Sequence, residues 1–519
     1  MLSKNTIIAC VSNLSTAYNL IVINIVHVLV QNQYCGGDKC KDEVSVASTA
    51  CLVGAIAGQL TFGYVGDCIG RSAALQLTMA FSILGALVSA FAVPLSPEHP
   101  ETVFTFLAIT RFILGLGVGG VYPLSATIAS ESAGSAASRG TTASIVFSMQ
   151  GIGSVTVPIV ALICVALFGN PPHTDPPTGH GLSWRLTLAF GALPGILLAP
   201  FKANETGQRR AQVVAAEGVD SSSLVVNAPA EAGGAGGGSG GSGAGDSGVS
   251  GAAPAPRPTL TLGQALCMRA YWGKLVGCAG GWLLFDITFY GNSLFQASVL
   301  EHIFNATSTT APVPVAGDVH TNRAIQMLLI ALIGLPGYYV AVGLMDRIGR
   351  RNMQMQGFFF MAVTFGVLGL GLHQLEGAPG LMLFVYGLTF FFSNFGPNST
   401  TFILPAETFP AHLRTTLNGF CAACGKLGAT IGSAAFKPLS QPDVLGLGNT
   451  MVLCAAVSLA GLLLTFAFVE DRRGKGMEGD HGPTPLIGSE GNSSAPNVTA
   501  ATEDGSGRAN ARKQSDDMI

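Results

Sequence analysis

The stretch GPNSTTFILPAETFPAHLRTTLNGFCAACGKLG, residues 396–428, contains the features that decide the fold. An apolar run leads into a short polar connection with an acid and a base, Glu407 and Arg414, and a second apolar run follows. Lys426 lies inside this second run, between CAACG and LGATIG, with no charged neighbour along the chain. If the run crosses a lipid bilayer, a charge at this position is costly to bury and marks a functional site.

The composition predicts a membrane protein. The chain has 519 residues, of which 49% are hydrophobic and only 11% are charged, whereas soluble domains carry about 25% charged residues. The net charge of -3 and the lack of a long basic stripe predict no nucleic-acid partner. The SxxK, HExxH and Walker patterns are absent, so we expect no enzymatic activity. We also expect no cofactor and no metal site, because CxxC at Cys421 and Cys424 in an apolar run is a weak signal.

Apolar segments long enough to cross a bilayer recur along the chain, and they predict an all-α membrane protein with twelve transmembrane helices. The alternating pattern of a transmembrane β-barrel is absent. The expected spans are 6–30, 44–65, 72–94, 103–128, 141–168, 183–201, 272–298, 323–345, 353–373, 380–404, 415–437 and 447–469.

Two polar stretches interrupt this pattern. Residues 202–262 include EAGGAGGGSGGSGAGDSG and have too few large apolar side chains to bury a core, so we expect a disordered linker. The tail is similarly polar. The predicted domains are a six-helix bundle (1–201), the linker (202–262), a second six-helix bundle (263–470) and a disordered tail (471–519).

Basic residues predict the orientation. The arginines that share one side of the twelve-span arrangement are Arg71, Arg139, Arg209, Arg210, Arg257, Arg347, Arg350, Arg351, Arg414, Arg472 and Arg473. Cytoplasmic loops carry an excess of Lys and Arg, so both termini and the linker are expected in the cytoplasm. Cys35 and Cys40 then face the other side, where either a disulfide or two free thiols are compatible with the sequence.

An internal repeat supports the two-bundle arrangement. GDCIGR (66–71) follows the second span, and MDRIGRR (345–351) follows the eighth. An acid and a base also follow the fourth and tenth spans, as Glu131 with Arg139 and Glu407 with Arg414. Parallel repeats of this kind place a substrate near the bilayer midplane, between the halves. We interpret these end charges as gating or bracing pairs: Asp67, Arg71, Glu131, Arg139, Asp346, Arg350, Glu407 and Arg414.

These loops resemble the signature loops of the major facilitator superfamily. RFILGLGVGGVYPLSATIASE (111–131) more specifically resembles the fourth-helix signature of the phosphate:proton symporters. FSMQGIG (147–153), WLLFDITFYGNSLFQ (282–296), DRIGR (346–350) and the stretch through Lys426 resemble the same family. The resemblance covers about 1–201 and 262–470. It implies a fold of two pseudo-repeated six-helix bundles and inorganic phosphate as the substrate.

The resemblance also implies the substrate-binding residues. Trp282, Asp286 and Tyr290 are spaced by four, so they share one helical face. An anion in a low-dielectric cavity needs donors and a compensating charge, and Lys426 supplies both. Asp286 repels phosphate unless one of them is protonated, which makes it the proton-coupling candidate; alternatively, Asp286 and Lys426 only brace the bundle. The full set is Tyr122, Gln150, Trp282, Asp286, Tyr290, Asn398 and Lys426.

Three acids of the family pattern are replaced, by Thr16 and Asn19 in the first helix and by Val121 in the fourth. We therefore expect a secondary active phosphate transporter that works by alternating access, with proton symport through Asp286. The alternatives are a phosphate uniporter, a sodium-coupled transporter, a carrier of another anion, and a phosphate sensor that does not transport. The resemblance implies a plasma-membrane location, with the lipid bilayer, phosphate and a proton or other cation as partners.

Overall fold

The computed structural model describes residues 3–35, 41–198, 262–299 and 319–471, apart from short gaps at 97, 134, 136–137, 169–179, 295, 297–298 and 376. These residues fall in one unit, Met1–Asp480. The predicted linker up to residue 261 and nearly all of the predicted tail lie outside the described residues. So does Cys40, whereas Cys35 is disulfide-bonded.

The first half of the chain forms long helices. They are α1 (Lys4–Ile21), α2 (Ile23–Cys35), α3 (Lys41–Ile69), α4 (Arg71–Ala90), the short η1 (Pro100–Thr102), α5 (Val103–Glu131), α6 (Arg139–Phe168) and α7 (His180–Phe190). The second half repeats this organisation. Its helices are α9 (Leu262–Cys267), α10 (Arg269–Leu275), η3 (Val276–Gly280), α11 (Gly281–Leu294), α13 (Val319–Ile348), α14 (Arg350–Leu370), α15 (Leu372–Leu375), α16 (Pro379–Asn394), α17 (Pro397–Thr408), α18 (Arg414–Leu439) and α19 (Gly446–Phe468).

The predicted spans agree with these helices to within a few residues, and the all-α fold class is confirmed. Ten described segments are long and apolar enough to cross a membrane. Two predicted spans do not meet that criterion: α18, and the crossing built from α10, η3 and α11. These two carry Lys426 and Asp286, and the seventh crossing is divided into helices shorter than a full span.

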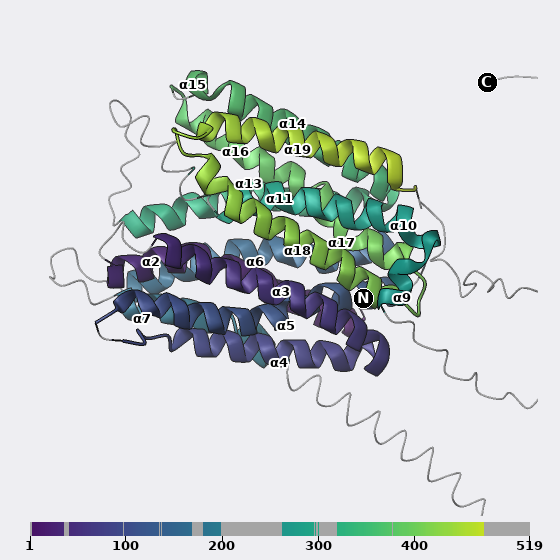
Figure 1. The fold of residues 1–519 in the computed structure, drawn as a ribbon, viewed down its shortest axis with the longest axis horizontal. Coiled ribbons are helices and arrows are strands. Elements are labelled where there is room, and N and C mark those ends of the chain that lie inside the picture. Colours follow the sequence, from purple (N-terminus) through teal and green to yellow (C-terminus); the bar gives the residue numbers. More distant parts are fainter. Residues whose placement is uncertain are drawn as a thin grey trace, which may run out of the picture. The chain divides into compact units, whose positions relative to one another are not determined.

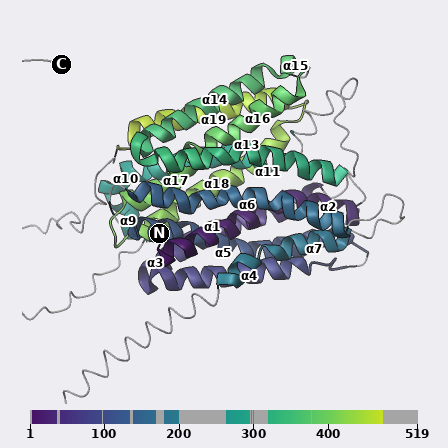
Figure 2. The same cartoon turned by 180° about the vertical axis from the view of Figure 1, so that it is seen from behind.

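The two halves lie side by side. In Figures 1 and 2 the purple and blue helices of the first half occupy one side, and the green and yellow helices of the second half occupy the other. Across the boundary α18 packs against α3, and α13 packs against α6. We call the end where α1 begins and α19 ends the terminal end; the opposite end is where α2 ends and α7 begins (Figure 1).

The internal repeat is visible in the backbone. Gly70 and Gly349 occupy equivalent places immediately before α4 and α14, and both adopt positive φ angles, 95° and 87°. Glycine tolerates this conformation because it has no Cβ. The two loops predicted from GDCIGR and MDRIGRR therefore turn in the same way.

Candidate functional site

Lys426 lies in the middle of α18 and points toward α11. Its Nζ donates hydrogen bonds to Asp286 Oδ2 at 2.9 Å and to Tyr290 Oη at 2.9 Å. Only 2% of each side chain of the Lys426–Asp286 pair is exposed. The charge that the sequence singled out is thus compensated by the carboxylate predicted to lie near it.

The seventh crossing aligns the other side chains with Lys426. Trp282, Asp286 and Tyr290 lie one turn apart on α11, as their spacing predicts. The π-helical segment η3 immediately precedes them, and such segments often occur at functional sites. Because a π-helical segment shifts the helical register, the polar face of α11 is offset from the corresponding face of α10.

Aromatic rings surround the ammonium group. Lys426 Nζ lies 4.2 Å from the ring centroid of Tyr290 and 5.2 Å from that of Tyr122. The Tyr122 ring meets Trp282 edge-on, with centroids 6.4 Å apart. Ring faces attract a cation, so a tyrosine from each half stabilises the same charge.

Polar contacts extend from Lys426 into the first half. The Tyr122 hydroxyl lies beside that of Tyr290, and the Gln150 amide lies beside Tyr122. Gln150 Nε2 donates no hydrogen bond to any residue that the structure describes. A row of donors therefore runs between the halves. Six of the seven predicted binding residues come together here: Tyr122, Gln150, Trp282, Asp286, Tyr290 and Lys426.

Asn398, the seventh predicted residue, belongs to a neighbouring network. The helix breaks at Gly396, between α16 and α17, and Pro397 opens α17. Asn398 Nδ2 donates to Tyr338 Oη at 2.9 Å and to Asn394 Oδ1 at 2.8 Å, so both amide hydrogens are used within the second half. Tyr338 and Asn394 were not predicted; Asn394 has a sequence signal, since it is a second asparagine in the same apolar run, four positions before Asn398.

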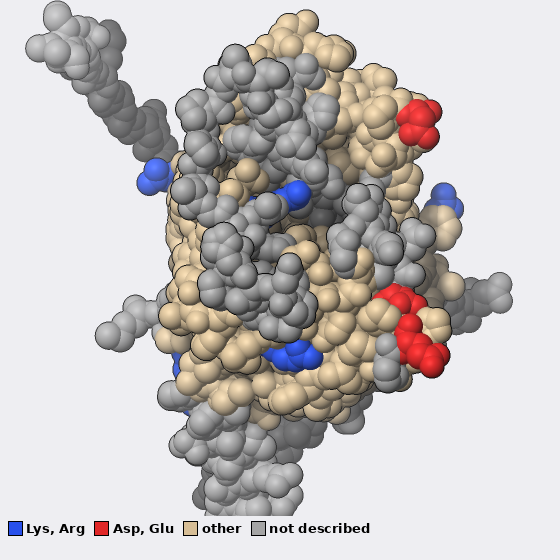
Figure 3. Space-filling view, turned by 90° about the vertical axis from the view of Figure 1, so that its left-hand side faces the viewer, with Lys and Arg blue, Asp and Glu red and all other residues tan. Residues whose placement is uncertain are grey.

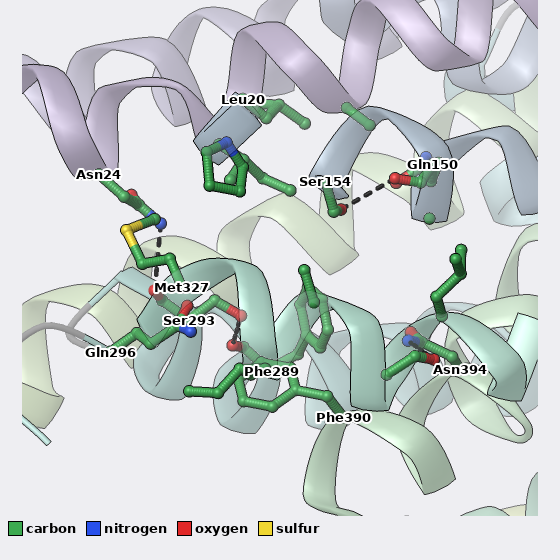
Figure 4. Close-up of a pocket in the computed structure, with 18 of the residues that line it drawn as sticks. Leu20, Asn24, Gln150, Ser154, Phe289, Ser293, Gln296, Met327, Phe390 and Asn394 are labelled. Atoms are coloured by element: carbon green, nitrogen blue, oxygen red, sulfur yellow. Dashed lines mark hydrogen bonds between the residues drawn. The ribbon is translucent and has the colours of Figure 1, made fainter. Parts of the chain in front are cut away.

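A cavity of about 80 Å³ adjoins this site between the halves. Figure 4 shows Gln150 and Ser154 of α6 across from Phe289 and Ser293 of α11, with Asn24 near Ser293. Residues from α13 and α16 also line it. No charged side chain belongs to the described lining. Because Gln150 and Tyr290 line the cavity, it leads to the Lys426 cluster.

The cavity extends toward the opposite end. Its lining includes Gln296, just beyond α11, and Met327, near the start of α13. Asn24 Nδ2 donates to Ser293 O at 3.1 Å and bridges the halves at this level. The described surface of the opposite end carries few charges (Figure 3).

Comparison with known proteins identifies the family. Residues 14–433 match the profile of the Major Facilitator Superfamily. The chain belongs to the Major Facilitator Superfamily. It is 36% identical over 511 residues to inorganic phosphate transporter 1-6 of Oryza sativa subsp. japonica, covering 91% of each chain. It is 34% identical to probable inorganic phosphate transporter 1-8 of Arabidopsis thaliana, covering 92% of this chain and 90% of that one.

A solved structure shows the same fold. The proton:xylose symporter XylE of E. coli aligns with a TM-score of 0.62 and 18% identity, covering 91% of this chain and 97% of that one. The resemblance predicted from the sequence is therefore confirmed at the level of family and fold. This facilitator is an integral multi-pass membrane protein.

The terminal end of the facilitator is closed by two equivalent contacts between its halves. Asp67 Oδ2 accepts hydrogen bonds from Thr416 N at 2.8 Å and Thr416 Oγ1 at 2.7 Å. Asp346 Oδ2 accepts from Thr141 N at 2.8 Å and Thr141 Oγ1 at 2.6 Å. Thr141 and Thr416 lie in the first turns of α6 and α18, where a helix N-terminus favours a carboxylate.

Ion pairs at the same end differ from the predicted pairing. Glu407 binds Arg350 rather than Arg414, through Nε–Oε2 at 2.8 Å and Nη2–Oε1 at 2.7 Å. Arg414 instead crosses to the first half and binds Glu131 Oε1 at 3.0 Å. The predicted pairs Glu407–Arg414 and Glu131–Arg139 are therefore wrong, because folding brings closer partners from other helices.

Arg71 joins this cluster. Its Nη2 lies 3.3 Å from Glu131 Oε1 and 3.3 Å from Asp67 Oδ1, which confirms the predicted Asp67–Arg71 pair. It also donates to Ala411 O at 2.9 Å, in the other half. The contacts between the halves are thus concentrated at the terminal end, while the cavity lies toward the opposite end.

One buried charge was missed by the sequence interpretation. Arg111 of α5 is 1% exposed. It opens the quoted fourth-helix signature, and a lone arginine in an apolar run is itself a functional signal. Thr16, Asn19 and Val121, which replace acids of the family pattern, are also buried in this half.

Proposed function

We propose that this facilitator transports inorganic phosphate across a membrane by alternating access. The observation that carries the proposal is the buried Lys426, shared by Asp286 and Tyr290, at the boundary between two repeated halves. The names of the relatives support phosphate as the substrate. The closed terminal end and the cavity toward the opposite end correspond to one of the two states that alternating access requires.

Phosphate enters through the uncharged cavity and meets the donors of Gln150 and Tyr290 first. At the site its oxygens compete with Asp286 for the ammonium hydrogens of Lys426. The Tyr122 hydroxyl and the Trp282 indole add donors from both sides. Phosphate therefore contacts both halves, so that its binding energy depends on how the halves meet.

Asp286 is the proposed site of proton coupling. Ionised, it neutralises Lys426 and repels phosphate; protonated, it leaves the ammonium charge for the anion. The buried acids among the described residues are Glu407 and Asp286. Glu407 is bound to Arg350 at the terminal end, so Asp286 is the buried acid that lies near the cavity. Proton and phosphate then enter together, and loss of the proton restores the Lys426–Asp286 pair and expels phosphate.

We further propose that the terminal end faces the cytoplasm of a cell whose plasma membrane holds the protein. Cytoplasmic loops carry an excess of Lys and Arg. The arginines at the start of helices at the terminal end fit this excess: Arg71, Arg350, Arg351 and Arg414. In this arrangement 1–201 and 263–470 are the two moving bundles, joined by the 202–262 connection, and 471–519 extends into the cytoplasm.

Uptake of labelled phosphate into proteoliposomes tests the function. We expect uptake that an inward proton gradient accelerates and a proton ionophore abolishes. Uptake that ignores both a pH gradient and sodium indicates uniport; dependence on sodium alone indicates sodium coupling. Phosphate binding without flux indicates a sensor. No phosphate binding and no flux at any pH would refute phosphate as the substrate.

A further inference from the structure

The first half contains a buried arginine without an acid. Arg111 is 1% exposed and makes no ion pair with any residue that the structure describes. Arginine does not lose its proton in proteins, and an unpaired charge in a low-dielectric interior is costly. The charge of Arg111 therefore needs a partner that the described residues do not supply.

One edge of the Arg111 guanidinium group makes no hydrogen bond to the described residues. Nη1 donates to Asn19 O at 2.9 Å. Nε and Nη2 donate no hydrogen bond to the described residues. The nearest titratable groups are the thiol of Cys51 and the hydroxyl of Tyr18, and Tyr18 Oη already donates to Thr187 O at 2.7 Å. Neither group is an acid that neutralises Arg111.

The same chain shows what this edge binds when a partner is present. Arg350 uses its Nε and Nη2 to hold both carboxylate oxygens of Glu407, at 2.8 and 2.7 Å. These two donors form a planar fork suited to an anion. Arg111 has the same fork, buried and without a hydrogen-bond partner among the described residues.

We propose that Arg111 binds a small inorganic anion, chloride or phosphate, at a second site in the first half of the facilitator. The anion lies against Nε and Nη2 and neutralises the guanidinium charge. This site differs from the Lys426 cluster, because Arg111 is not part of the cavity lining or of the Lys426 contacts. It is independent of which substrate the transporter carries.

Thermal unfolding of the purified full-length chain in lipid nanodiscs tests the proposal. Chloride replaces gluconate at constant sodium concentration and ionic strength. We expect the melting temperature to rise by roughly 2–5 °C and to saturate, since a ligand that binds only the native state stabilises it. Lys426→Gln should keep this response and Arg111→Gln should lose it. In the Lys426→Gln background, inorganic phosphate replaces chloride to distinguish the two anions.

A matched pair at Cys51 provides the second measurement. Both variants are made in the Lys426→Gln background, because Cys51 lies within electrostatic reach of Lys426 as well as of Arg111. There Cys51→Asp places a carboxylate near Arg111 and should make stability independent of the anion, whereas Cys51→Asn, of the same size, should keep the response. This pair decides the question even if Arg111→Gln does not fold. The proposal is overturned if neither anion stabilises the wild type, if Arg111→Gln responds like the wild type, or if both Cys51 variants respond equally.

Discussion

Removing Asp286 and Lys426 one at a time and together separates substrate binding from bracing. The variants are Asp286→Asn, Lys426→Gln and the double variant, which keep side-chain size and remove charge. Each single variant leaves one charge buried without its partner. The double variant leaves none, so it removes the binding group without the cost of an isolated charge.

The structure sets the magnitude. Lys426 Nζ and Asp286 Oδ2 lie 2.9 Å apart with 2% of each side chain exposed, and at an effective dielectric constant of about 20 they attract by about 6 kcal/mol. Breaking a buried pair on one side typically costs about 3–5 kcal/mol, whereas replacing both partners is often close to neutral. We expect each single variant to lose about 3–5 kcal/mol of stability and the double variant to lose about 1 kcal/mol.

The assay combines thermal unfolding in nanodiscs with phosphate uptake in proteoliposomes. All three variants should lose uptake, although the double variant folds. Arg351→Gln is the matched control: it removes a charge that lies over the Phe466 ring on the exposed side of α14, and it should change neither measurement. Wild-type uptake in the double variant would show that the pair only braces the bundle. Unchanged stability in both single variants would contradict the buried-pair argument itself.

Three further predictions concern the gate, the repeat loops and the second network. Asp67→Ala and Asp346→Ala each remove two hydrogen bonds to a carboxylate, so each should favour opening of the terminal end by about 1.5–3 kcal/mol. Opening of the terminal end closes the cavity at the opposite end, so a single cysteine placed in the cavity should be labelled more slowly from that side. Equal labelling rates in both variants and the wild type would contradict the gate. Gly70→Ala and Gly349→Ala should each destabilise the protein by about 1–3 kcal/mol, because φ is 95° and 87° with ψ at 145° and 151°. Thermal unfolding checks this, and a loss at only one of them argues against equivalent loops. Asn398→Ala should raise the KM for phosphate more than it lowers kcat if Asn398 turns to the substrate, and unchanged uptake kinetics would leave it with a purely structural role.

Most of the fold follows from hydropathy, because a chain in lipid must satisfy its backbone hydrogen bonds within helices. The repeat was visible because GDCIGR and MDRIGRR need the same glycine conformation. Lys426 was found from the cost of its burial, and the face of α11 from a spacing of four. The helices, the repeat, Lys426 and the polar face of α11 can all be predicted from local sequence, because lipid solvates neither backbone polar groups nor charges.

The ion pairs at the terminal end were not predictable in the same way. Glu131 has Arg139 nearby in sequence, but it binds Arg71 and Arg414 from other helices. Which arginine reaches Glu131 depends on how the two halves pack together. Spacing along the sequence does not give the distance between its carboxylate and an arginine of another helix. The same applies to Asn398, whose amide hydrogens are used by Tyr338 and Asn394.

The charges buried away from the ends connect the two proposals. In the described residues these are Arg111, Asp286 and Lys426, so the protein interior is positive by one unit unless an anion accompanies Arg111. Without that anion, one monovalent phosphate alone neutralises the interior, which favours uniport. With the anion bound at Arg111, the interior is already neutral before phosphate binds. Binding of monovalent phosphate then keeps the interior neutral only if a proton binds as well. Occupancy at Arg111 therefore determines which coupling mode avoids an uncompensated charge, and proton dependence should be measured at fixed chloride concentrations.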